Sequence, residues 1–381
     1  MNQKELNEIR RRIAPNQCAI NKLYGCYVNS NKEIIARLQE SLGLMTEFES
    51  EKYLSLLKKV LSGSLGKNLI DIVFSTQQVV DSPEHKLLST LRKTGLNDSF
   101  SREDFFQKVI DTLDMGESNY LILLAYDTYD VPYRSKDDDL QADASDRVFP
   151  YILCAVCPVK DQKPELAYYP RDNEFHTQGI SQIVSPPELG FLFPAFDNRA
   201  ANLYNALFYT KNDDQIHQEF IDAIFHTEPP MSAAEQKETF QSVLTDALEE
   251  ACSYDVVQAV HEQLSARLVQ HKERKDPEPL DLSSREIGAI LRDSGVPEDR
   301  VQTFETQCAQ QFGPDSALRP SNLIDSKRFQ IETAQIKISV DPESSYQIET
   351  KIIGGRPYLL IPAGDNVEVN GIPISLPVRE P

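Results

Sequence analysis

The sequence predicts an α+β fold in which a mixed or antiparallel central sheet is flanked by helices. Two apolar runs, Tyr120–Tyr126 and Tyr151–Val159, have the composition of strands that are covered on both faces. Segments with apolar residues at helical spacing lie before and after these runs. From about Lys327 onward, apolar and polar residues alternate with a period of two, which is typical of short antiparallel strands.

Residues 1–114 are expected to supply helices and the first strands of the sheet. The predicted helices span residues 3–12, 84–94 and 101–114, and the predicted strands span Cys18–Val28 and Leu69–Phe74. A further helix, which ends near Gly63, is predicted from the spacing of Leu54, Leu57, Val60 and Leu61, preceded by Phe48 and Tyr53. Residues 33–40 fit either a second strand or the start of a helix, and the pattern does not decide between them. The helix at 101–114 has the clearest start, because Ser101 and Asp104 form a capping signal.

The middle of the chain continues the sheet and then becomes helical. Between the two apolar runs, the acidic segment Arg134–Asp146 is expected to be an exposed and mobile loop. Further strands are predicted at residues 165–169, 180–184, 189–193 and 202–210, and helices at residues 214–226, 232–251 and 254–273. Ser232 and Glu235 have the spacing of a capping box at the start of the second of these helices.

Linkers and changes of period predict three domains. Lys275–Leu282 contains two prolines among charged residues and is the best candidate for a linker. After it, Ser283 and Glu286 have the spacing of a helix cap. The predicted domains are a main α+β domain at residues 1–275, a helical hairpin at residues 283–313 and a small C-terminal antiparallel β domain at residues 325–381.

Charge is spread unevenly along the 381 residues, whose formal net charge is −20. Residues 1–67 hold 11 Lys and Arg against 7 Asp and Glu, whereas the remaining residues hold 28 against 52. Such an acidic body repels phosphate backbones, so general nucleic-acid binding is not expected. The basic run Arg10–Arg12 is expected to dock on the acidic body or to remain in solvent.

The sequence also predicts a cytoplasmic location. The first residues are polar where a secretory signal needs a basic start and an apolar run of roughly 7–15 residues. No apolar stretch approaches the roughly 18 residues that span a bilayer, so no membrane association is expected. The six cysteines are therefore expected to be reduced thiols. We expect a protein partner, and the sequence leaves the oligomeric state open.

Cys154 and Cys157 have the C-x-x-C spacing of zinc and thiol redox sites. In a strand, however, residues three apart point to opposite faces and cannot share a tetrahedral ion. Buried structural thiols are therefore the preferred interpretation, and a metal site is the alternative. Cys18 and Cys26 would lie about 26 Å apart on one strand, which is beyond joint coordination.

Residues 62–68 partly follow the pattern of a phosphate-binding loop. The pattern fails because Leu61 stands where the first glycine is required and Asn68 stands where Ser or Thr is required. A helix end that runs into a turn is the preferred interpretation. If the loop binds a ligand, its backbone N–H groups and Lys67 favour an anion.

Asp127 and Asp130 close the first central strand, and paired carboxylates at a strand end are typical of magnesium sites and acid–base pairs. Further carboxylates follow at Asp137, Asp138, Asp139, Asp143 and Asp146. These do not form a calcium loop, because Ala142 stands where glycine is required. A solvated acidic loop is the preferred interpretation, and a divalent metal site assisted by Lys67 or Arg199 is the alternative.

The segment Gly190–Arg199 joins an aromatic strand to a polar cluster. If it floors a pocket, the residues at the mouth are Asp197, Asn198, Arg199 and Asn202. Core packing followed by a turn is the preferred interpretation. The six histidines show neither H-x-x-x-H nor H-E-x-x-H spacing and are expected at the surface or on helix faces.

Several stretches, taken together, resemble a known family. They are Gly25–Val28, Leu61–Leu69, Tyr151–Val159, Gly190–Arg199, Glu235–Phe240 and Val367–Gly371. In their order and spacing, over nearly the whole chain, they resemble a bacterial family without an assigned function, domain of unknown function 4317. The resemblance implies a bacterial cytoplasmic protein of this length. It brings no reaction, cofactor or catalytic residue to this chain.

The failure of each catalytic motif favours a protein that acts through interactions or regulation, without catalytic activity and without a cofactor. The alternative is a metal-dependent hydrolase or nuclease-like enzyme that uses Asp127 and Asp130 at the end of a central strand. A third hypothesis is a thiol or zinc protein that uses Cys154 and Cys157.

Overall fold

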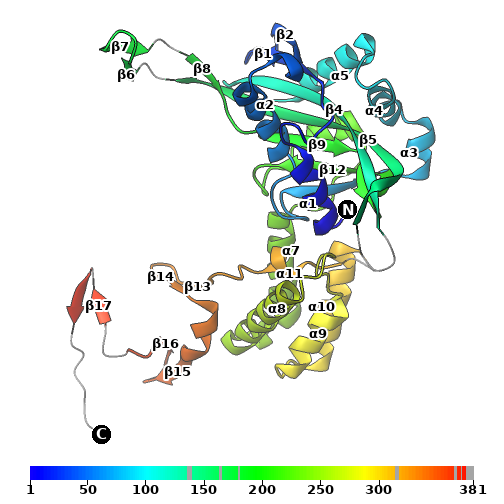
Figure 1. The fold of residues 1–381 in the computed structure, drawn as a ribbon. Coiled ribbons are helices and arrows are strands. Elements are labelled where there is room, and N and C mark those ends of the chain that lie inside the picture. The colour runs from blue at the N-terminus through cyan, green and yellow to red at the C-terminus, as the bar shows by residue number, and fades with distance from the viewer. Residues whose placement is uncertain are drawn as a thin grey trace. The chain divides into compact units, whose positions relative to one another are not determined.

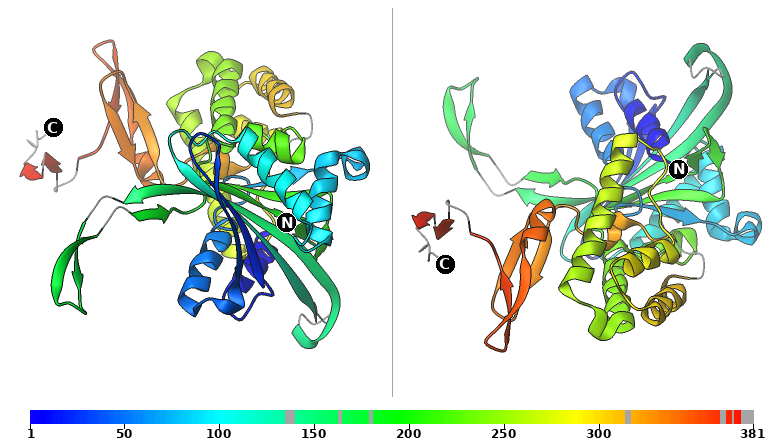
Figure 2. Two further views of the ribbon diagram at one scale, coloured as in Figure 1. Left: turned by 90° about the horizontal axis from the view of Figure 1, so that it is seen from above. Right: turned by 90° about the horizontal axis from the view of Figure 1, so that it is seen from below.

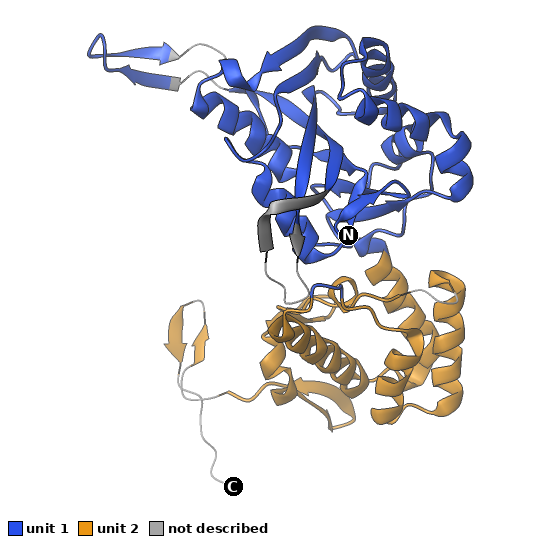
Figure 3. Ribbon diagram, turned by 45° about the vertical axis from the view of Figure 1, so that its right-hand side comes forward, with its two compact units in different colours: residues 1–235, 277–279 blue, residues 236–276, 280–381 orange. Residues whose placement is uncertain are grey.

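The computed structural model describes residues 1–134, 140–162, 165–178, 181–313, 317–363, 367–369 and 371–374. The chain divides into two compact units (Figure 3). Unit 1 contains residues 1–235 and 277–279, and unit 2 contains residues 236–276 and 280–381. Within the described ranges, no helix combines the length and the apolar character that crossing a membrane requires.

Unit 1 is built around an eight-stranded antiparallel sheet (Figure 1). Its strands are β1 (Lys22–Val28), β2 (Ile34–Ser41), β3 (Leu69–Val73), β4 (Asn119–Arg134), β5 (Leu140–Gln162), β8 (Ser181–Val184), β9 (Leu189–Phe193) and β12 (Asn205–Thr210). The strand order is β2-β1-β4-β5-β9-β12-β3, and β8 pairs with the last residues of β5. The structure confirms the α+β class and shows that the sheet is antiparallel.

Helices cover both faces of this sheet (Figure 2). They are α1 (Gln3–Arg12), α2 (Glu47–Lys59), α3 (Thr76–Asp81), α4 (Pro83–Lys93), α5 (Ser99–Thr112) and α6 (Gln218–Phe225). Because side chains alternate along a strand, Leu123 of β4 joins the core under α1 and α2, whereas Leu124 joins the core under α4, α5 and α6. The prediction of central strands that are covered on both faces is confirmed.

Tight packing beside β5 requires Gly190 in β9. A Cβ atom at this position would lie 2.3 Å from the carbonyl oxygen of Cys154 and 2.8 Å from Cγ2 of Val60. Only glycine allows β9 to approach both groups, which is the usual reason for a glycine inside a strand. This residue therefore fixes the contact between the end of α2 and the middle of the sheet.

The hairpin of β4 and β5 is longer than predicted. Its ladder continues to the pair Arg134 and Leu140, with irregularities beside Pro132. The predicted acidic loop is therefore wrong for residues 140–146, which belong to β5, because backbone pairing continues through the acidic segment. Residues 135–139 lie outside the described residues, as do the side chains of residues 140–146.

Local hydrogen bonds move several other predicted boundaries. The undecided segment 33–40 contains β2, which pairs antiparallel with β1. Helix α5 begins earlier than predicted, because Asp98 caps it by accepting from the backbone N–H of Ser101. Strand β1 begins at Lys22 rather than at Cys18.

Two short hairpins complete unit 1. They are β6 (Glu165–Tyr169) with β7 (Glu174–Gln178), and β10 (Ala195–Asp197) with β11 (Ala200–Asn202). The predicted strand at residues 202–210 therefore contains the end of β11 and all of β12. Asn198 and Arg199 adopt positive φ at the tip of the β10–β11 hairpin. This turn lets the Arg199 side chain reach Glu8 of α1.

Unit 2 has a helical core of its own. Its helices are α7 (Ala233–Leu248), which begins in unit 1, α8 (Tyr254–Arg274), α9 (Ser284–Asp293), α10 (Glu298–Phe312) and α11 (Pro320–Leu323). Phe240 and Leu264 pack with Phe304, so the helices over residues 236–276, which the sequence assigned to the main domain, share a core with the helical hairpin. Ser283 and Glu286 form the predicted capping box.

The C-terminal strands form antiparallel hairpins, as predicted. The pairs are β13 (Phe329–Glu332) with β14 (Lys337–Val340), β15 (Glu349–Ile353) with β16 (Arg356–Leu360), and β17 (Val367–Val369) with β18 (Ile372–Ile374). Within the described part of the C-terminal region, these pairs are separate two-stranded sheets rather than one continuous sheet. Gly354 and Gly355, both with positive φ, form the tight turn between β15 and β16.

Candidate functional site

Asp127 is a buried carboxylate whose side chain binds other parts of unit 1. Its Oδ1 atom accepts hydrogen bonds from the backbone N–H groups of Ala19, at 2.7 Å, and Thr128, at 2.9 Å. Its Oδ2 atom accepts from the phenol of Tyr151 at 2.5 Å and lies 3.8 Å from Nη2 of Arg12. Because donors surround both oxygens, this carboxylate acts as a structural acceptor.

Asp130 does not converge with Asp127. The two residues lie three positions apart on β4 and therefore point to opposite faces of the sheet. Asp127 is 1% exposed on the face covered by α1 and α2, whereas Asp130 is exposed opposite Val148. The predicted pair therefore lacks the geometry in which two carboxylates share a metal ion.

Arg199, the predicted assisting residue, instead joins the β10–β11 hairpin to α1. Its Nη1 atom donates to both carboxylate oxygens of Glu8, at 2.7 and 2.6 Å, and its Nη2 atom donates to the carbonyl of Pro132 at 2.9 Å. Glu8 also accepts a 2.6 Å hydrogen bond from the phenol of Tyr129. Burial and this hydrogen bond raise the pKa of Tyr129 to about 12, so the phenol remains a donor at neutral pH.

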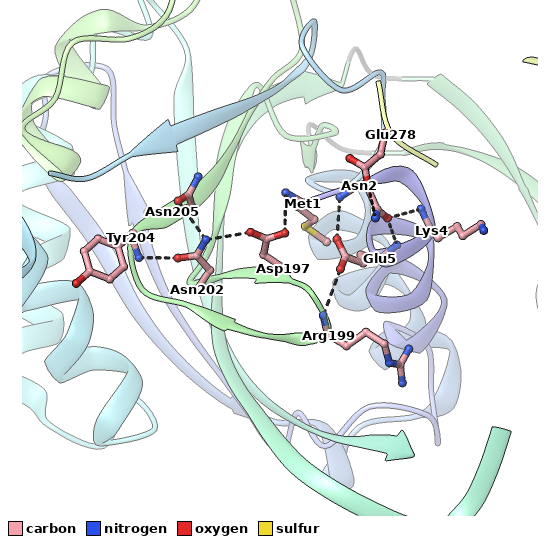
Figure 4. A network of polar contacts seen from close by, with 10 residues as sticks. All are labelled: Met1, Asn2, Lys4, Glu5, Asp197, Arg199, Asn202, Tyr204, Asn205 and Glu278. Atoms are coloured by element: carbon pink, nitrogen blue, oxygen red, sulfur yellow. Dashed lines mark hydrogen bonds and ion pairs between the residues drawn. The ribbon is translucent and has the colours of Figure 1, made fainter. Parts of the chain in front are cut away.

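Asp197 and the backbone of Arg199 contact the first residues of the chain (Figure 4). Asp197 lies 3.7 Å from the amino group of Met1 and accepts a 3.1 Å hydrogen bond from Asn202. The backbone N–H of Arg199 donates to Glu5 at 3.2 Å. Of the four residues predicted at the mouth of a pocket, Asp197 and Arg199 thus hold the start of the chain and α1 beside the hairpin.

The loop at residues 62–68 closes on itself. The backbone N–H groups of Gly66, Lys67 and Leu69 donate to carbonyl groups within the turn, at 2.7 to 3.2 Å. The Asn68 side chain donates to the carbonyls of Thr210 and Lys211, which ties the loop to β12. These donors are engaged by the chain itself, and the loop joins α2 to β3 as a turn.

The six cysteines are free thiols. Cys154 belongs to the core under α4, α5 and α6, and Cys157 belongs to the core under α1 and α2. Strand alternation separates the two thiols as predicted. Burial raises the pKa of Cys157 to about 12 and that of Cys154 well above its ordinary value, so both remain protonated.

Metal ligands do not gather in the part of the chain that the structure describes. Within that part, no group of three or more His, Cys, Asp or Glu side chains has the geometry to hold a metal ion. Of the predicted acidic loop, Asp137, Asp138 and Asp139 lie outside the described residues, and Asp143 and Asp146 belong to β5 without described side chains.

A groove in unit 2 is the best candidate for a binding site. Its volume is about 240 Å³, and it lies where α7, α8, α11 and β13 meet. Its apolar lining residues are Phe240, Leu244, Val257, Val260, Leu323, Ile324 and Phe329. Its polar lining residues are Lys237, Gln241, His261, Asp325, Arg328 and Gln330. We call it the α7–α8 groove.

His261 anchors the segment before β13 to α8. Its Nε2 atom donates to the carbonyl of Asp325 at 2.9 Å, and its ring packs edge to face against Phe329 with centroids 5.2 Å apart. Burial lowers the pKa of His261, against the opposing effect of the Asp325 carbonyl, so the imidazole is neutral at pH 7. The wall of the groove is therefore held by a neutral hydrogen bond and a ring contact.

Comparison with known families shows which family the chain belongs to. Residues 1–372 match the family described as domain of unknown function (DUF4317). The chain belongs to the DUF4317 family. No curated protein matches it at a significant level.

In this DUF4317 chain, sequence reasoning missed the α7–α8 groove. The lining residues come from three separate segments, around residues 237–244, 257–261 and 323–330. The sequence pattern of each segment, taken by itself, predicts only residues that pack in a core. One available signal is Val257, an apolar residue beside the buried stripe of α8 whose side chain is 42% exposed.

Proposed function

We propose that this chain is a cytoplasmic bacterial interaction protein whose α7–α8 groove binds a short segment of a partner protein. The segment carries apolar side chains and at least one carboxylate. The observation that supports this proposal is an apolar groove bordered by the cationic side chains of Lys237 and Arg328. Grooves of this kind accept the apolar face of a peptide helix in many complexes.

The size of the groove favours side chains of a peptide over an enclosed cofactor. Its volume of about 240 Å³ is below the roughly 300–1,000 Å³ of typical small-molecule sites. Phe240 and Phe329 are buried at the base, while Val257 remains 42% exposed at the edge. A partner that covers Val257 would remove this apolar surface from water, which is favourable.

Charge gives the groove a preference among peptides. Lys237 is half-buried and Arg328 is exposed, and both line a groove in a chain of net charge −20. Asp325, the one carboxylate among the described lining residues, accepts the backbone N–H of Lys327 at 2.9 Å. An acidic side chain of the partner would therefore meet two cations at the rim.

The lining residues favour binding over catalysis. The described residues that line the groove include no Ser, Thr or Cys to serve as a nucleophile. His261 uses Nε2 to hold the backbone of Asp325 rather than to orient a reactive group. The groove thus supports recognition, in agreement with the interaction role expected from the sequence.

The test begins with a random peptide library displayed against the immobilised full chain. We expect the enriched peptides to combine apolar residues with Asp or Glu. A labelled enriched peptide is then titrated by fluorescence polarisation. The variant Val257→Asp should bind it at least tenfold more weakly. The new carboxylate would repel the acidic side chain of the peptide and would lose its hydration when the peptide covers it. Lys237→Glu should weaken binding several-fold at low salt and less at high salt.

Val269→Asp is the matched control, because Val269 lies on the same helix, is 57% exposed and is not among the groove residues. It should bind the peptide with an affinity within about twofold of the original chain. The proposal fails if no peptide is enriched, or if Val257→Asp and Val269→Asp bind the enriched peptides alike.

The metal-dependent hydrolase or nuclease-like alternative lacks a supporting observation. Asp127 is engaged by other groups of unit 1, and Asp130 points to the other face of the sheet. Melting curves with magnesium, manganese and zinc test this alternative directly. Stabilisation by a metal that disappears in Asp127→Asn would favour the enzyme over the interaction protein.

A further inference from the structure

A second cavity lies in unit 1, at the end of the central sheet where β1 begins. Its volume is about 340 Å³, within the roughly 300–1,000 Å³ of small-molecule sites. Its polar and aromatic lining residues are Asn21, Lys22, Tyr24, Asn97, Tyr126 and Thr128. We call this cavity the tyrosine pocket.

Strand pairing builds the floor of the tyrosine pocket. Tyr24 of β1 lies opposite Leu124 of β4, so Tyr126 is its diagonal neighbour on the same face of the sheet. Lys22 lies two residues before Tyr24 on β1 and therefore also projects on this face. The register thus places two phenol rings and one ammonium group together.

The connection between α4 and α5 forms the opposite wall. Gly95 and Leu96 adopt left-handed φ angles of 57° and 62°, and the N–H of Leu96 donates to the carbonyl of Leu91 at 2.9 Å. A Cβ atom on Gly95 would lie 3.3 Å from Cε1 of Tyr126, so the loop backbone packs closely against this ring. Asn97 accepts a 3.5 Å hydrogen bond from the phenol of Tyr24.

Cationic side chains lie in and beside the tyrosine pocket. The guanidinium of Arg102 lies 4.1 Å from the centroid of the Tyr24 ring. Half-buried Arg92 interacts with Tyr126, and its buried Nε atom has no hydrogen-bond partner in the structure. The described lining residues include Lys22 and no carboxylate. Asp98, which interacts with Arg102, is engaged as the cap of α5.

One buried carboxylate, Asp127, adjoins the lining of the tyrosine pocket, where it accepts the backbone N–H groups of Ala19 and Thr128. This carboxylate lies 3.8 Å from Nη2 of Arg12, a cation that offsets its charge.

We propose that the tyrosine pocket binds a small planar anion, in which an aromatic ring or base carries a carboxylate or phosphate group. The planar ring would lie against the partly exposed phenol ring of Tyr126, because Tyr24 is buried and Arg102 covers a face of its ring. The anionic group would meet Lys22, with Arg92 adding to the attraction. The amide groups of Asn21 and Asn97 supply both donors and acceptors for the polar edge of the ring.

Isothermal titration calorimetry of the full chain tests this proposal. The planar anions are adenosine monophosphate and benzoate, adenosine is the ring without the anion, and inorganic phosphate is the anion without the ring. We expect at least one planar anion to bind with a Kd below about 1 mM. Adenosine and phosphate should each bind at least tenfold more weakly than that anion. If adenosine monophosphate has the lower Kd the ligand class is a nucleotide, and if benzoate has the lower Kd it is an aromatic acid.

Lys22→Glu should weaken this binding at least tenfold without unfolding the chain, because Lys22 is exposed. Lys59→Glu is the matched control: it makes the same charge change at an exposed position at the end of α2 and should alter the Kd by less than about twofold. Tyr126→Ala should also weaken binding, with its melting curve recorded alongside. The proposal is overturned if neither planar anion binds below about 1 mM, or if the two lysine variants bind equally.

Discussion

The phenol of Tyr151 donates a 2.5 Å hydrogen bond to Asp127, directly across the ladder of β4 and β5. The same carboxylate accepts from Ala19, which precedes β1, and lies beside Arg12 at the end of α1. One buried charge therefore holds the chain between α1 and β1 against the sheet. Asp127 therefore has a structural role inside β4, and the prediction that Asp127 and Asp130 close the strand is wrong, because the ladder with β5 continues to Arg134.

Asp127→Asn should lower the free energy of unfolding by about 3 kcal/mol. The asparagine side chain places an N–H₂ group where a carboxylate oxygen accepted hydrogen bonds, so that at least one buried donor loses its acceptor. The loss of a buried hydrogen bond to a charged group costs about 1.5–3 kcal/mol or more. Asp130→Asn, the matched control on the exposed face, should change the free energy by less than about 0.5 kcal/mol. Urea denaturation of both variants provides the comparison. Equal stabilities of the two variants would refute the structural role of Asp127.

Glu8 and Arg199 should be energetically coupled. Their bidentate contact is largely shielded, with side chains that are 19% and 22% exposed. A double-mutant cycle with alanine at both positions should give a coupling energy of about 1–2 kcal/mol. The bidentate pair Arg37 and Glu103, with side chains that are 56% and 46% exposed, should give less than about 1 kcal/mol. Identical couplings would show that burial does not strengthen the first pair.

The thiols should separate into two groups by reactivity. Cys26, Cys154, Cys157 and Cys308 are buried, and burial raises the pKa of each, to about 11 for Cys26 and to about 12 for Cys308. Cys18 and Cys252 are partly exposed. Burial raises the pKa of Cys18 and Cys252 as well, but their partial exposure gives the reagent access. Timed iodoacetamide labelling at pH 8, read by mass spectrometry, should therefore modify these two thiols first. Early labelling of Cys154 or Cys157 would indicate an accessible, activated thiol.

His261 should make the stability of unit 2 depend on pH. Its pKa is lowered by burial in the folded state, so the unfolded chain binds a proton more readily. This contribution to stability is complete above the unfolded pKa of about 6.5 and is lost as the pH falls below it. His261→Gln should therefore flatten the loss of stability between pH 7 and pH 5, measured by urea denaturation. An unchanged slope would show that His261 does not titrate in this range.

The sequence predicted the central sheet well, because strands that are buried on both faces consist of nearly uninterrupted runs of apolar residues. The runs around Tyr120–Tyr126 and Tyr151–Val159 lie in β4 and β5 at the predicted places. The acidic segment between them misled the prediction, since the hydrogen bonds of an antiparallel ladder join backbone groups and do not depend on the charge of the side chains. Composition therefore located the strands but not their ends.

A candidate site requires that its side chains lie close together in space. Spacing along one strand predicts which side chains share a face, but not which residues of other segments lie beside them. Strand alternation correctly separated Cys154 from Cys157, and the same argument applied to Asp127 and Asp130 separates them. The partners of Arg199 could not be predicted, because Glu8 lies far away in sequence. The α7–α8 groove was missed for the same reason.

Photo-crosslinking tests the central proposal most directly. An enriched peptide carrying a benzophenone group is irradiated with the full chain, and the crosslinked fragments are identified by mass spectrometry. We expect crosslinks in the three segments that line the α7–α8 groove, residues 237–244, 257–261 and 323–330, and we expect their loss in Val257→Asp. Crosslinks confined to unit 1, or unchanged in Val257→Asp, would contradict it.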